Sequence, residues 1–172
     1  MFAQAKARRG TFLAPLLLLL GVGGAQAEPP LKLPQIDLIR VQKAARTMEL
    51  WSDGRRVHVI PHIQLGDEPT GPKRFEGDER TPEGRYEIDW GNPKSAYHLS
   101  LHISYPNAQD RAYAEARGRS AGGMIMIHGQ PNALPVGRVP GDWTDGCIAV
   151  ANAEIEALYE SVPDGTPIEI NP

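Results

Sequence analysis

Glycine and proline are too frequent along this chain for a fold built of long helices. The 172 residues include 18 glycines and 16 prolines. Both residues disfavour helix interiors, and both are frequent in the tight turns that join short strands. A chain of this length most often folds as one domain with a sizeable core. The sequence therefore predicts a single, turn-rich, mostly β domain with a few short helices.

Short segments with apolar residues at alternate positions predict where the strands lie. The first strand is expected within residues 36–51, a hairpin turn at residues 52–54 and a second strand within residues 55–66. The continuous apolar run at residues 122–129 is typical of a strand buried on both faces. Further strands are expected at residues 85–90, 97–105 and 165–170, and short helices at residues 107–118 and 152–162.

The N-terminal segment predicts an export signal followed by a linker. Residues 1–27 combine a basic start, an apolar stretch and the small-residue pattern "AQA", which is typical of a signal peptide cleaved before Glu28. An uncleaved membrane anchor is the alternative, although the apolar stretch is shorter than the ~20 residues that a membrane span needs. Three prolines in residues 28–35 indicate an extended linker. The folded domain is therefore expected at residues 36–172.

The charge balance argues against a nucleic-acid partner. The full chain has 18 basic and 21 acidic residues, and removal of residues 1–27 would take away three basic residues and no acidic ones. The mature protein would therefore be acidic, and an acidic exported protein has little reason to bind a polyanion. After signal cleavage no remaining segment is expected to span a membrane.

A long polar segment rich in glycine and proline, residues 66–84, is flanked by predicted strands on both sides. A loop of this length between ordered elements is typically functional. Its basic pair, Lys73 and Arg74, has two interpretations: it attracts the carboxylates of a ligand, or it forms solvated surface. The acidic residues that follow, at positions 76–79, lack the regular alternation of oxygen ligands of a calcium loop.

Histidine spacing does not predict a zinc site. His58 and His62, like His98 and His102, are four residues apart in predicted strands. Residues four apart along a strand share a face but lie about 13 Å apart at ~3.3 Å per residue, which is too far for one metal ion. No metal is expected.

Cys147 is the only cysteine in the chain. In an exported protein it has no partner for an internal disulfide, so three interpretations stand: a functional thiol, an intermolecular bridge, or a small buried hydrophobe. His128 is the best candidate for a base that accepts the thiol proton, because imidazole titrates near neutral pH. Both residues lie where an apolar run meets a glycine, a place at which a strand end can present a side chain to solvent.

Backbone groups beside these two side chains suit acyl transfer. Gly129 allows a tight turn, so a main-chain carbonyl could hold the second ring nitrogen of His128 and select its tautomer. Backbone N–H groups at Gly146 and Cys147 could stabilise the oxygen of an attacked carbonyl. The residues alone leave this function open beside an accidental pairing of one histidine with one cysteine.

Several ordered motifs resemble the L,D-transpeptidase catalytic domain (YkuD-type) family. The family has a His-Gly pair followed some fifteen to twenty residues later by Ser/Thr-His-Gly-Cys, and this chain has "IHG" followed by "TDGCIAV". Upstream, "GPKRFEGDERTPEGRYEID" is similar to the family's Gly-Asp, Thr-Pro-x-Gly and Tyr pattern, and "GTPIEI" is similar to its closing strand. The resemblance covers residues 36–170 and implies a single-domain, β-sandwich-like fold.

The resemblance also implies roles for the residues of the two motifs. It implies that Cys147 is the nucleophile, that His128 is its base and that the carbonyl of Gly129 orients that base. It places Gly146 in the turn that forms the oxyanion site. The neighbours expected to contribute to that site or to bind substrate are Thr144, Asp145 and Trp143, of which Trp143 has simple packing as its alternative role.

Members of this family act on the stem peptides of peptidoglycan, so the resemblance implies a periplasmic enzyme of cell-wall biogenesis or remodelling. The thiolate attacks a carbonyl next to a diaminopimelate centre and passes the acyl group to an amine, which is L,D-transpeptidation. Hydrolysis is the alternative, either as an L,D-carboxypeptidase or as an amidase that releases peptidoglycan-linked lipoprotein, as in a similar periplasmic subgroup. An inactive wall-binding module is the alternative from another class. No metal or organic cofactor is implied, and the oligomeric state is not predicted.

Two positions depart from the family pattern. Asp145 stands where the family usually has histidine, and Ala149 stands where it usually has arginine. A carboxylate beside the thiol would raise the thiol pKa unless it faces away or pairs with a cation. Loss of the arginine removes a cation that could meet a substrate carboxylate.

Overall fold

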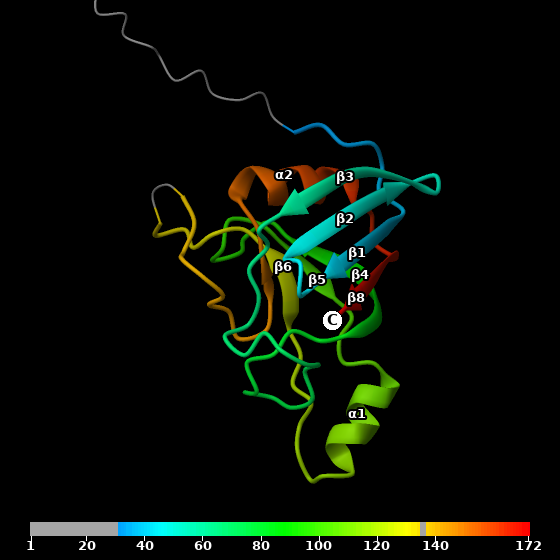
Figure 1. Ribbon diagram of the computed structural model, residues 1–172, viewed down its shortest axis with the longest axis vertical. Helices are drawn as coiled ribbons and strands as arrows, with labels where there is room; N and C mark the ends of the chain where they lie inside the picture. Colours follow the sequence, from blue (N-terminus) through cyan, green and yellow to red (C-terminus); the bar gives the residue numbers. More distant parts are fainter. Residues whose placement is uncertain (1–30, 135–136) are drawn as a thin grey trace, which may run out of the picture.

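One eight-stranded β-sheet forms the frame of the protein, as a computed structural model shows for residues 31–134 and 137–172 (Figure 1). The expected export signal at residues 1–27 and the first part of the expected linker lie outside the described residues. The strands are β1 (Leu38–Gln42), β2 (Thr47–Ser52), β3 (Arg55–Pro61), β4 (Gly84–Asn92), β5 (Ser100–Ile103), β6 (Ile125–His128), β7 (Ile148–Ala149) and β8 (Thr166–Asn171). The helices are α1 (Ala108–Glu115) and α2 (Asn152–Ser161). The prediction of a mostly β fold with a few short helices is confirmed.

The strands follow the order β3-β2-β1-β8-β4-β5-β6-β7 across the sheet. The pairs β1–β8 and β6–β7 are parallel, and the other neighbours are antiparallel. Two parallel neighbours need a long crossover connection, which residues 129–147 provide between β6 and β7. This crossover brings the two sequence motifs around His128 and Cys147 to adjacent strands.

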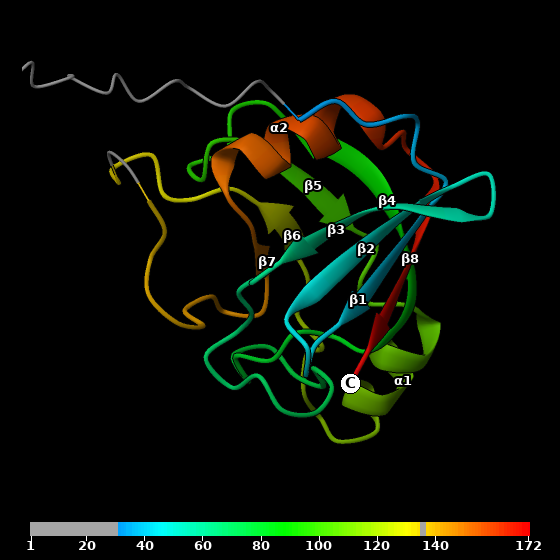
Figure 2. The same cartoon turned by 45° about the horizontal axis from the view of Figure 1, so that its top comes forward.

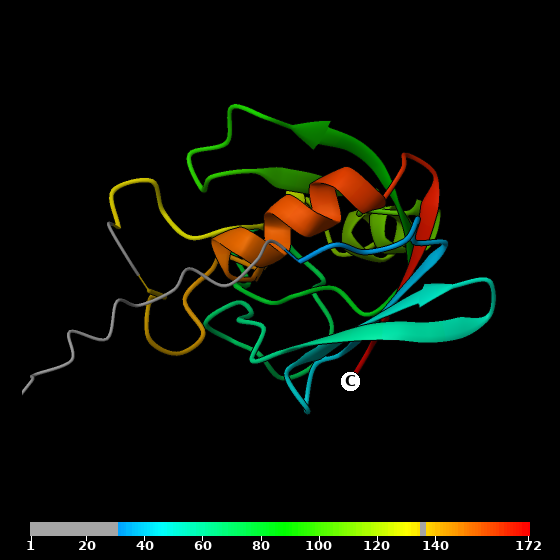
Figure 3. The ribbon, with the colours of Figure 1, turned by 90° about the horizontal axis from the view of Figure 1, so that it is seen from above.

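The sheet curls around one core, so that a single sheet supplies both layers of the sandwich-like fold (Figure 2). Seen from above, α2 lies over the open end between the β2–β3 hairpin and the strands β4 and β5, whereas α1 lies at the far end (Figure 3). The segment after β3 also pairs with β7 through Gln64 and Ala149, whose two backbone hydrogen bonds measure 2.9 and 2.8 Å. The two edges of the sheet are therefore linked on the side of the β6–β7 crossover.

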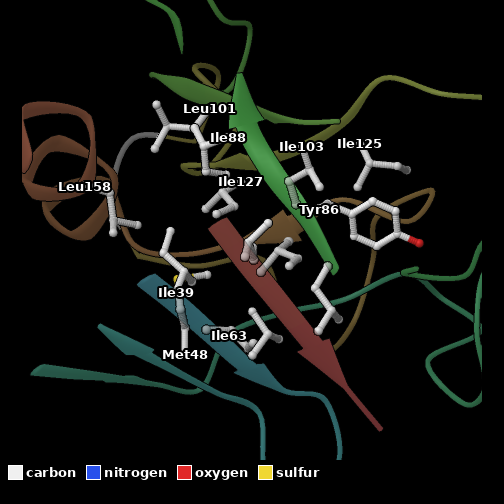
Figure 4. Close-up of a cluster of buried hydrophobic side chains, with 14 of the residues drawn as sticks. Ile39, Met48, Ile63, Tyr86, Ile88, Leu101, Ile103, Ile125, Ile127 and Leu158 are labelled. Carbon is white, nitrogen blue, oxygen red and sulfur yellow. The ribbon is translucent and has the colours of Figure 1, made fainter. Parts of the chain in front are cut away.

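Apolar side chains from all parts of this curl meet in the interior (Figure 4). Ile39 and Met48 from the first hairpin lie on one side of the cluster, with Ile88 and Ile127 across from them and Leu158 of α2 at the end. All five side chains are fully buried. Burying one such side chain contributes about 1.5–3 kcal/mol, so this core is a main source of stability. Strand β6 is buried along its whole length, as the continuous apolar run predicts.

Both helices begin with a hydrogen bond between side chain and backbone in the first turn. The Asn107 side chain accepts the backbone N–H of Asp110 at 3.1 Å, and the Glu154 carboxylate accepts that of Ala151 at 2.6 Å. Such bonds satisfy N–H groups that the first helical turn leaves unpaired. Neither helix is long and apolar enough to cross a membrane, a finding that covers the described residues alone.

The structure differs from the sequence prediction in the first strand. Residues 36–51 hold two strands, β1 and β2, joined by a turn in which Arg46 has a φ of 52°. The apolar alternation continues on both sides of this turn, so the period alone does not reveal where the chain reverses.

Lys43, in the β1–β2 turn, ties this hairpin to the long loop of residues 66–84. Its ammonium donates hydrogen bonds to the carbonyls of Gly71 at 2.6 Å and Thr81 at 3.0 Å, and it forms an ion pair with Glu83 at 2.8 Å. Only 2% of the Lys43 side chain is exposed, and this burial lowers the pKa of its ammonium despite the opposing effect of Glu83. The three acceptors replace the water that the buried charge has lost.

We expect Lys43→Met to lower the free energy of unfolding by about 3 kcal/mol, because it leaves the Glu83 carboxylate and two carbonyl oxygens without their donor. Methionine keeps most of the apolar stem, so the change isolates the ammonium group. Urea denaturation followed by circular dichroism measures the difference. The matched control is Lys94→Met at an exposed position, which should change the same free energy by less than about 0.5 kcal/mol. Equal effects of the two changes would contradict the role of Lys43.

Candidate active site

A pocket of about 400 Å³ lies beside the end of β6 and the start of β7. Its lining includes Cys147 and His128, the two residues that the sequence singles out for chemistry. Three further predicted site residues, Trp143, Thr144 and Asp145, line the same pocket. The remaining lining residues are Tyr97, Gly123, Met124 and Ile125. The structure thus brings five of the seven predicted residues into one cavity wall. The other two, Gly129 and Gly146, are not lining residues but are the chain neighbours of His128 and Cys147.

Pairing between β6 and β7 explains why the two motifs meet. In this parallel pair Ile127 lies opposite Ile148, and both side chains are fully buried in the core. Side chains alternate between the two faces of a strand, so the residues next to these isoleucines turn away from them. His128 follows Ile127 and Cys147 precedes Ile148, and both are therefore directed to the pocket side.

One hydrogen bond fixes the tautomer of the His128 imidazole. Its Nδ1 lies 2.7 Å from the carbonyl oxygen of Gly129. A carbonyl oxygen can only accept, so Nδ1 carries the proton and Nε2 keeps a free lone pair. Burial lowers the pKa of His128, and the hydrogen bond to Gly129 offsets this only in part. His128 is therefore a neutral base at neutral pH.

Two aromatic rings enclose this imidazole. The ring centroid of Tyr97 lies 4.6 Å from that of His128, and the centroid of Trp143 lies 5.6 Å from it. Trp143 therefore lines the pocket and packs on the base at the same time, which joins its two predicted roles. Sequence reasoning missed Tyr97, whose only signal is its place at the start of a predicted strand.

Gly129 lies in a space that excludes any side chain. A Cβ atom at this position would be 2.6 Å from the side-chain oxygen of Asn152 and 3.0 Å from the carbonyl oxygen of Tyr97. Its N–H donates to the carbonyls of Tyr97 at 3.0 Å and Leu99 at 3.2 Å. The backbone next to the carbonyl that orients His128 is thus fixed by these contacts.

The Cys147 thiol is held by the backbone of the segment across from it. The N–H of Met126 donates to Sγ at 3.4 Å, and the thiol donates to the carbonyl of Met124 at 3.7 Å. Burial raises the pKa of Cys147; the Met126 hydrogen bond opposes this, the Asp145 carboxylate adds to it, and the Lys73 ammonium acts against it. At neutral pH the two side chains are therefore a neutral thiol and a neutral imidazole.

A tight turn from Thr144 to Cys147 presents the thiol. The Thr144 hydroxyl donates to the carbonyl of Cys147 at 2.7 Å and accepts the N–H of Gly146 at 3.2 Å. Gly146 has a φ of 123°, and a Cβ there would lie 2.5 Å from the carbonyl oxygen of Arg80. The turn therefore requires glycine, and the N–H of Gly146 is already engaged by Thr144.

Two glutamines hold the segment that carries Trp143. The Gln64 amide donates to the carbonyls of Val139 and Gly141, and its oxygen accepts the amide of Gln130 at 3.0 Å. Both glutamines are buried. Sequence reasoning missed this pair, because the two residues are 66 positions apart and no local pattern connects them.

An ion pair also holds the segment that carries Trp143. Asp142 lies 2.6 Å from Arg46 and accepts the backbone N–H of Leu65 at 2.8 Å. Asp142 directly precedes Trp143, so this contact sets the position of the indole in the pocket wall. Sequence reasoning missed both members of the ion pair, although Asp142 begins the motif that contains the cysteine.

Other residues considered in the sequence lie outside the pocket lining. Only 4% of the Lys73 side chain is exposed, and its ammonium pairs with Asp78 at 2.9 Å. The Arg74 guanidinium lies 4.6 Å from the ring centroid of Tyr113. Lys73 is therefore a buried structural residue, and Arg74 stacks on an aromatic ring. Within residues 31–134 and 137–172, no cluster of three or more histidine, cysteine, aspartate or glutamate side chains could hold a metal ion.

Comparison with known proteins identifies the family that this chain matches. The sequence model of a family described as "YkuD: L,D-transpeptidase catalytic domain" matches residues 36–170. A search of curated protein sequences finds no match.

Solved structures of related shape include two at more than 25% identity. The helical cell shape determining protein Pgp2 from Campylobacter jejuni is 29% identical, with a TM-score of 0.63, over 80% of this chain and 48% of that chain. Bdellovibrio bacteriovorus Bd1075 is 26% identical, with a TM-score of 0.54, over 79% of this chain and 48% of that chain. This chain spans about half the length of these two proteins. An L,D-transpeptidase from Xylanimonas cellulosilytica, 18% identical with a TM-score of 0.50 over 84% of this chain and 64% of that chain, shares the fold.

We expect Asp145→Asn to increase the rate at which iodoacetamide alkylates Cys147 at any fixed pH below the thiol pKa. Removing the carboxylate removes one of the causes that raise this pKa, so a larger fraction of the thiol is ionised at the same pH. The measurement is the alkylation rate between pH 6 and pH 10, followed by mass spectrometry.

The matched control is Asp164→Asn, which makes the same charge change at an exposed position outside the pocket lining. It should leave the pH profile where the unsubstituted protein has it. A profile for Asp145→Asn that coincides with the control would show that this carboxylate does not act on the thiol.

Proposed function

Because the chain belongs to the YkuD family of L,D-transpeptidase catalytic domains, we propose that it transfers acyl groups of peptidoglycan stem peptides through Cys147. The observation that carries this proposal is that Cys147 and His128 line one pocket. Enzymatic activity is typical of the family, and an intact pair of nucleophile and base argues against an inactive wall-binding module.

The first half of the reaction forms a thioester. Cys147 Sγ attacks the carbonyl carbon of a stem-peptide bond while its proton passes to Nε2 of His128, the ring nitrogen that the Gly129 contact leaves free. The C–N bond then breaks, and the leaving amine takes the proton back from His128. Proton transfer during the attack suits this site, because burial disfavours a standing pair of thiolate and imidazolium.

The second half of the reaction releases the acyl group. An acceptor amine or a water molecule attacks the thioester carbon and gives a proton to His128 Nε2. The C–S bond then breaks, and Nε2 returns that proton to the sulfur, which restores the Cys147 thiol. In both halves the negative oxygen needs a hydrogen-bond donor. We assign this role to the backbone N–H of Cys147, since Thr144 engages the N–H of Gly146. Thr144 is then a positioning residue of the turn, and Trp143 and Asp145 contact the substrate.

Hydrolysis is the second candidate, and two residues favour it. Asp145 is one of the residues that line the pocket, and the fully buried Ala149 leaves β7 without the arginine usual in the family. A site without that cation has less to hold the carboxylate of a transfer substrate. The hydrolytic forms are an L,D-carboxypeptidase and an amidase that releases peptidoglycan-linked lipoprotein.

We extend the proposal to the setting of the reaction. An export signal at residues 1–27 and a linker at residues 28–35 would deliver a catalytic domain of residues 36–172 to the periplasm, where peptidoglycan lies. The likeness to a helical cell shape determining protein supports a role in remodelling the wall.

We expect Cys147→Ala to reduce conversion of purified peptidoglycan by at least about a thousandfold, because the nucleophile is lost. Muropeptides from digests with the mature protein and the variant are compared by mass spectrometry. New cross-links or exchanged D-amino acids identify transfer, whereas shortened stems or freed lipoprotein fragments identify hydrolysis.

The variant's thermal unfolding midpoint serves as the control for folding. Cys147→Ser is the conservative comparison and should lose activity to a similar extent, since a serine hydroxyl ionises far less readily than a thiol. Unchanged products in both variants would remove Cys147 from the mechanism and overturn the proposal.

A further inference from the structure

The pocket carries a single formal charge at neutral pH, and that charge is negative. Among the residues that the structure describes, Asp145 is the only acidic or permanently basic one in the pocket lining. His128 is neutral there, because its burial lowers the pKa of the imidazole. The other lining groups are aromatic rings, apolar side chains, glycine, a hydroxyl and the thiol. A bound substrate therefore meets a negative potential close to the reacting sulfur.

The nearby cations Arg46 and Lys73 form their ion pairs with other carboxylates. Arg46 pairs with Asp142 at 2.6 Å, and Lys73 pairs with Asp78 at 2.9 Å. In the part of the chain that the structure describes, no ion pair involves Asp145, which is exposed to solvent. Its carboxylate is thus free to accept hydrogen bonds from a ligand.

We infer that Asp145 is a specificity-determining residue that binds a free ammonium group on the substrate beside the carbonyl that Cys147 attacks. An ammonium donates charge-assisted hydrogen bonds to a carboxylate, whereas a substrate carboxylate at the same place would be repelled. The inference deepens the proposed function and rests on it, since it names the chemical group that this acyl-transfer site recognises. The substrate class is a peptide with a diamino-acid residue whose second amine is unsubstituted.

Ammonium binding has a consequence for the thiol. A cation held by Asp145 cancels the field that this carboxylate exerts on Cys147, and so removes one cause of the raised thiol pKa. The right substrate then eases ionisation of its own nucleophile, while the empty site keeps the thiol protonated. Recognition and activation are coupled through one side chain.

Two synthetic stem peptides that differ only in the second amine of the diamino acid, free in one and N-acetylated in the other, test the inference. We expect the mature protein to prefer the free amine in kcat/KM by about tenfold, the lower range for a hydrogen bond to a charged group. In Asp145→Asn the ratio of the two kcat/KM values should fall to near one, chiefly through a higher KM for the free-amine peptide. The preference of the unsubstituted protein should also shrink as salt is raised.

Asp164→Asn is the matched control, and it should keep the tenfold ratio because the exposed residue lies outside the pocket lining. A ratio that is unchanged in Asp145→Asn, or equal turnover of the two peptides by the unsubstituted protein, overturns the inference and leaves the acyl-transfer proposal intact. Failure to turn over either peptide, together with no conversion of peptidoglycan, overturns the proposed function itself. The two failures are therefore distinguishable.

Discussion

Close packing of three backbone segments beneath the cysteine turn is the constraint on which the pocket depends. Gly66 and Thr144 form a bridge between two of these segments, and the N–H of Asp67 donates to the carbonyl of Thr144 at 3.0 Å. A Cβ at Gly66 would lie 2.0 Å from the carbonyl oxygen of Glu79, and glycine is needed at position 146 for the same reason. The loop of residues 66–84 therefore packs against the turn that carries the thiol. Lys43 holds this loop in place and so contributes to the stability of the site.

Much of the fold follows from local sequence patterns, because alternation of apolar residues reports which face of a strand is buried. The run at residues 122–129 predicts a strand buried on both faces, and β6 is one. The break between β1 and β2 is not visible in this way, since apolar alternation both precedes and follows the turn and no glycine or proline marks residues 43–46. A long-range contact supports the turn: Lys43 points inward to acceptors 28 to 40 residues away.

The candidate site also has a part that local sequence patterns predict and a part that depends on long-range contacts. Cys147, His128 and their glycines stand out because a reactive side chain next to a glycine is a local signal, and ordered motifs reinforce it. Tyr97, Gln64 and the Arg46–Asp142 ion pair are ordinary polar or aromatic residues whose meaning arises only when distant segments meet. Their contacts hold His128 and Trp143 in place. The sequence therefore did not predict the residues that position the side chains of the pocket.

In the proposed reaction, the charge beside the thiol bears on whether an amine or water acts as the acceptor. An amine approaching the thioester arrives as an ammonium ion and must lose a proton before it can attack. Asp145 attracts the cation but also stabilises its protonated form, which raises the amine's pKa and keeps it from acting as a nucleophile. Water has no such step, since His128 takes its proton during the attack itself. Ala149 adds to this, because at that buried position in β7 no cation offsets the carboxylate. A site with this balance holds an ammonium group well as part of the substrate and poorly as the attacking group, and this is the electrostatic argument that keeps hydrolysis as the second candidate beside the proposed transfer.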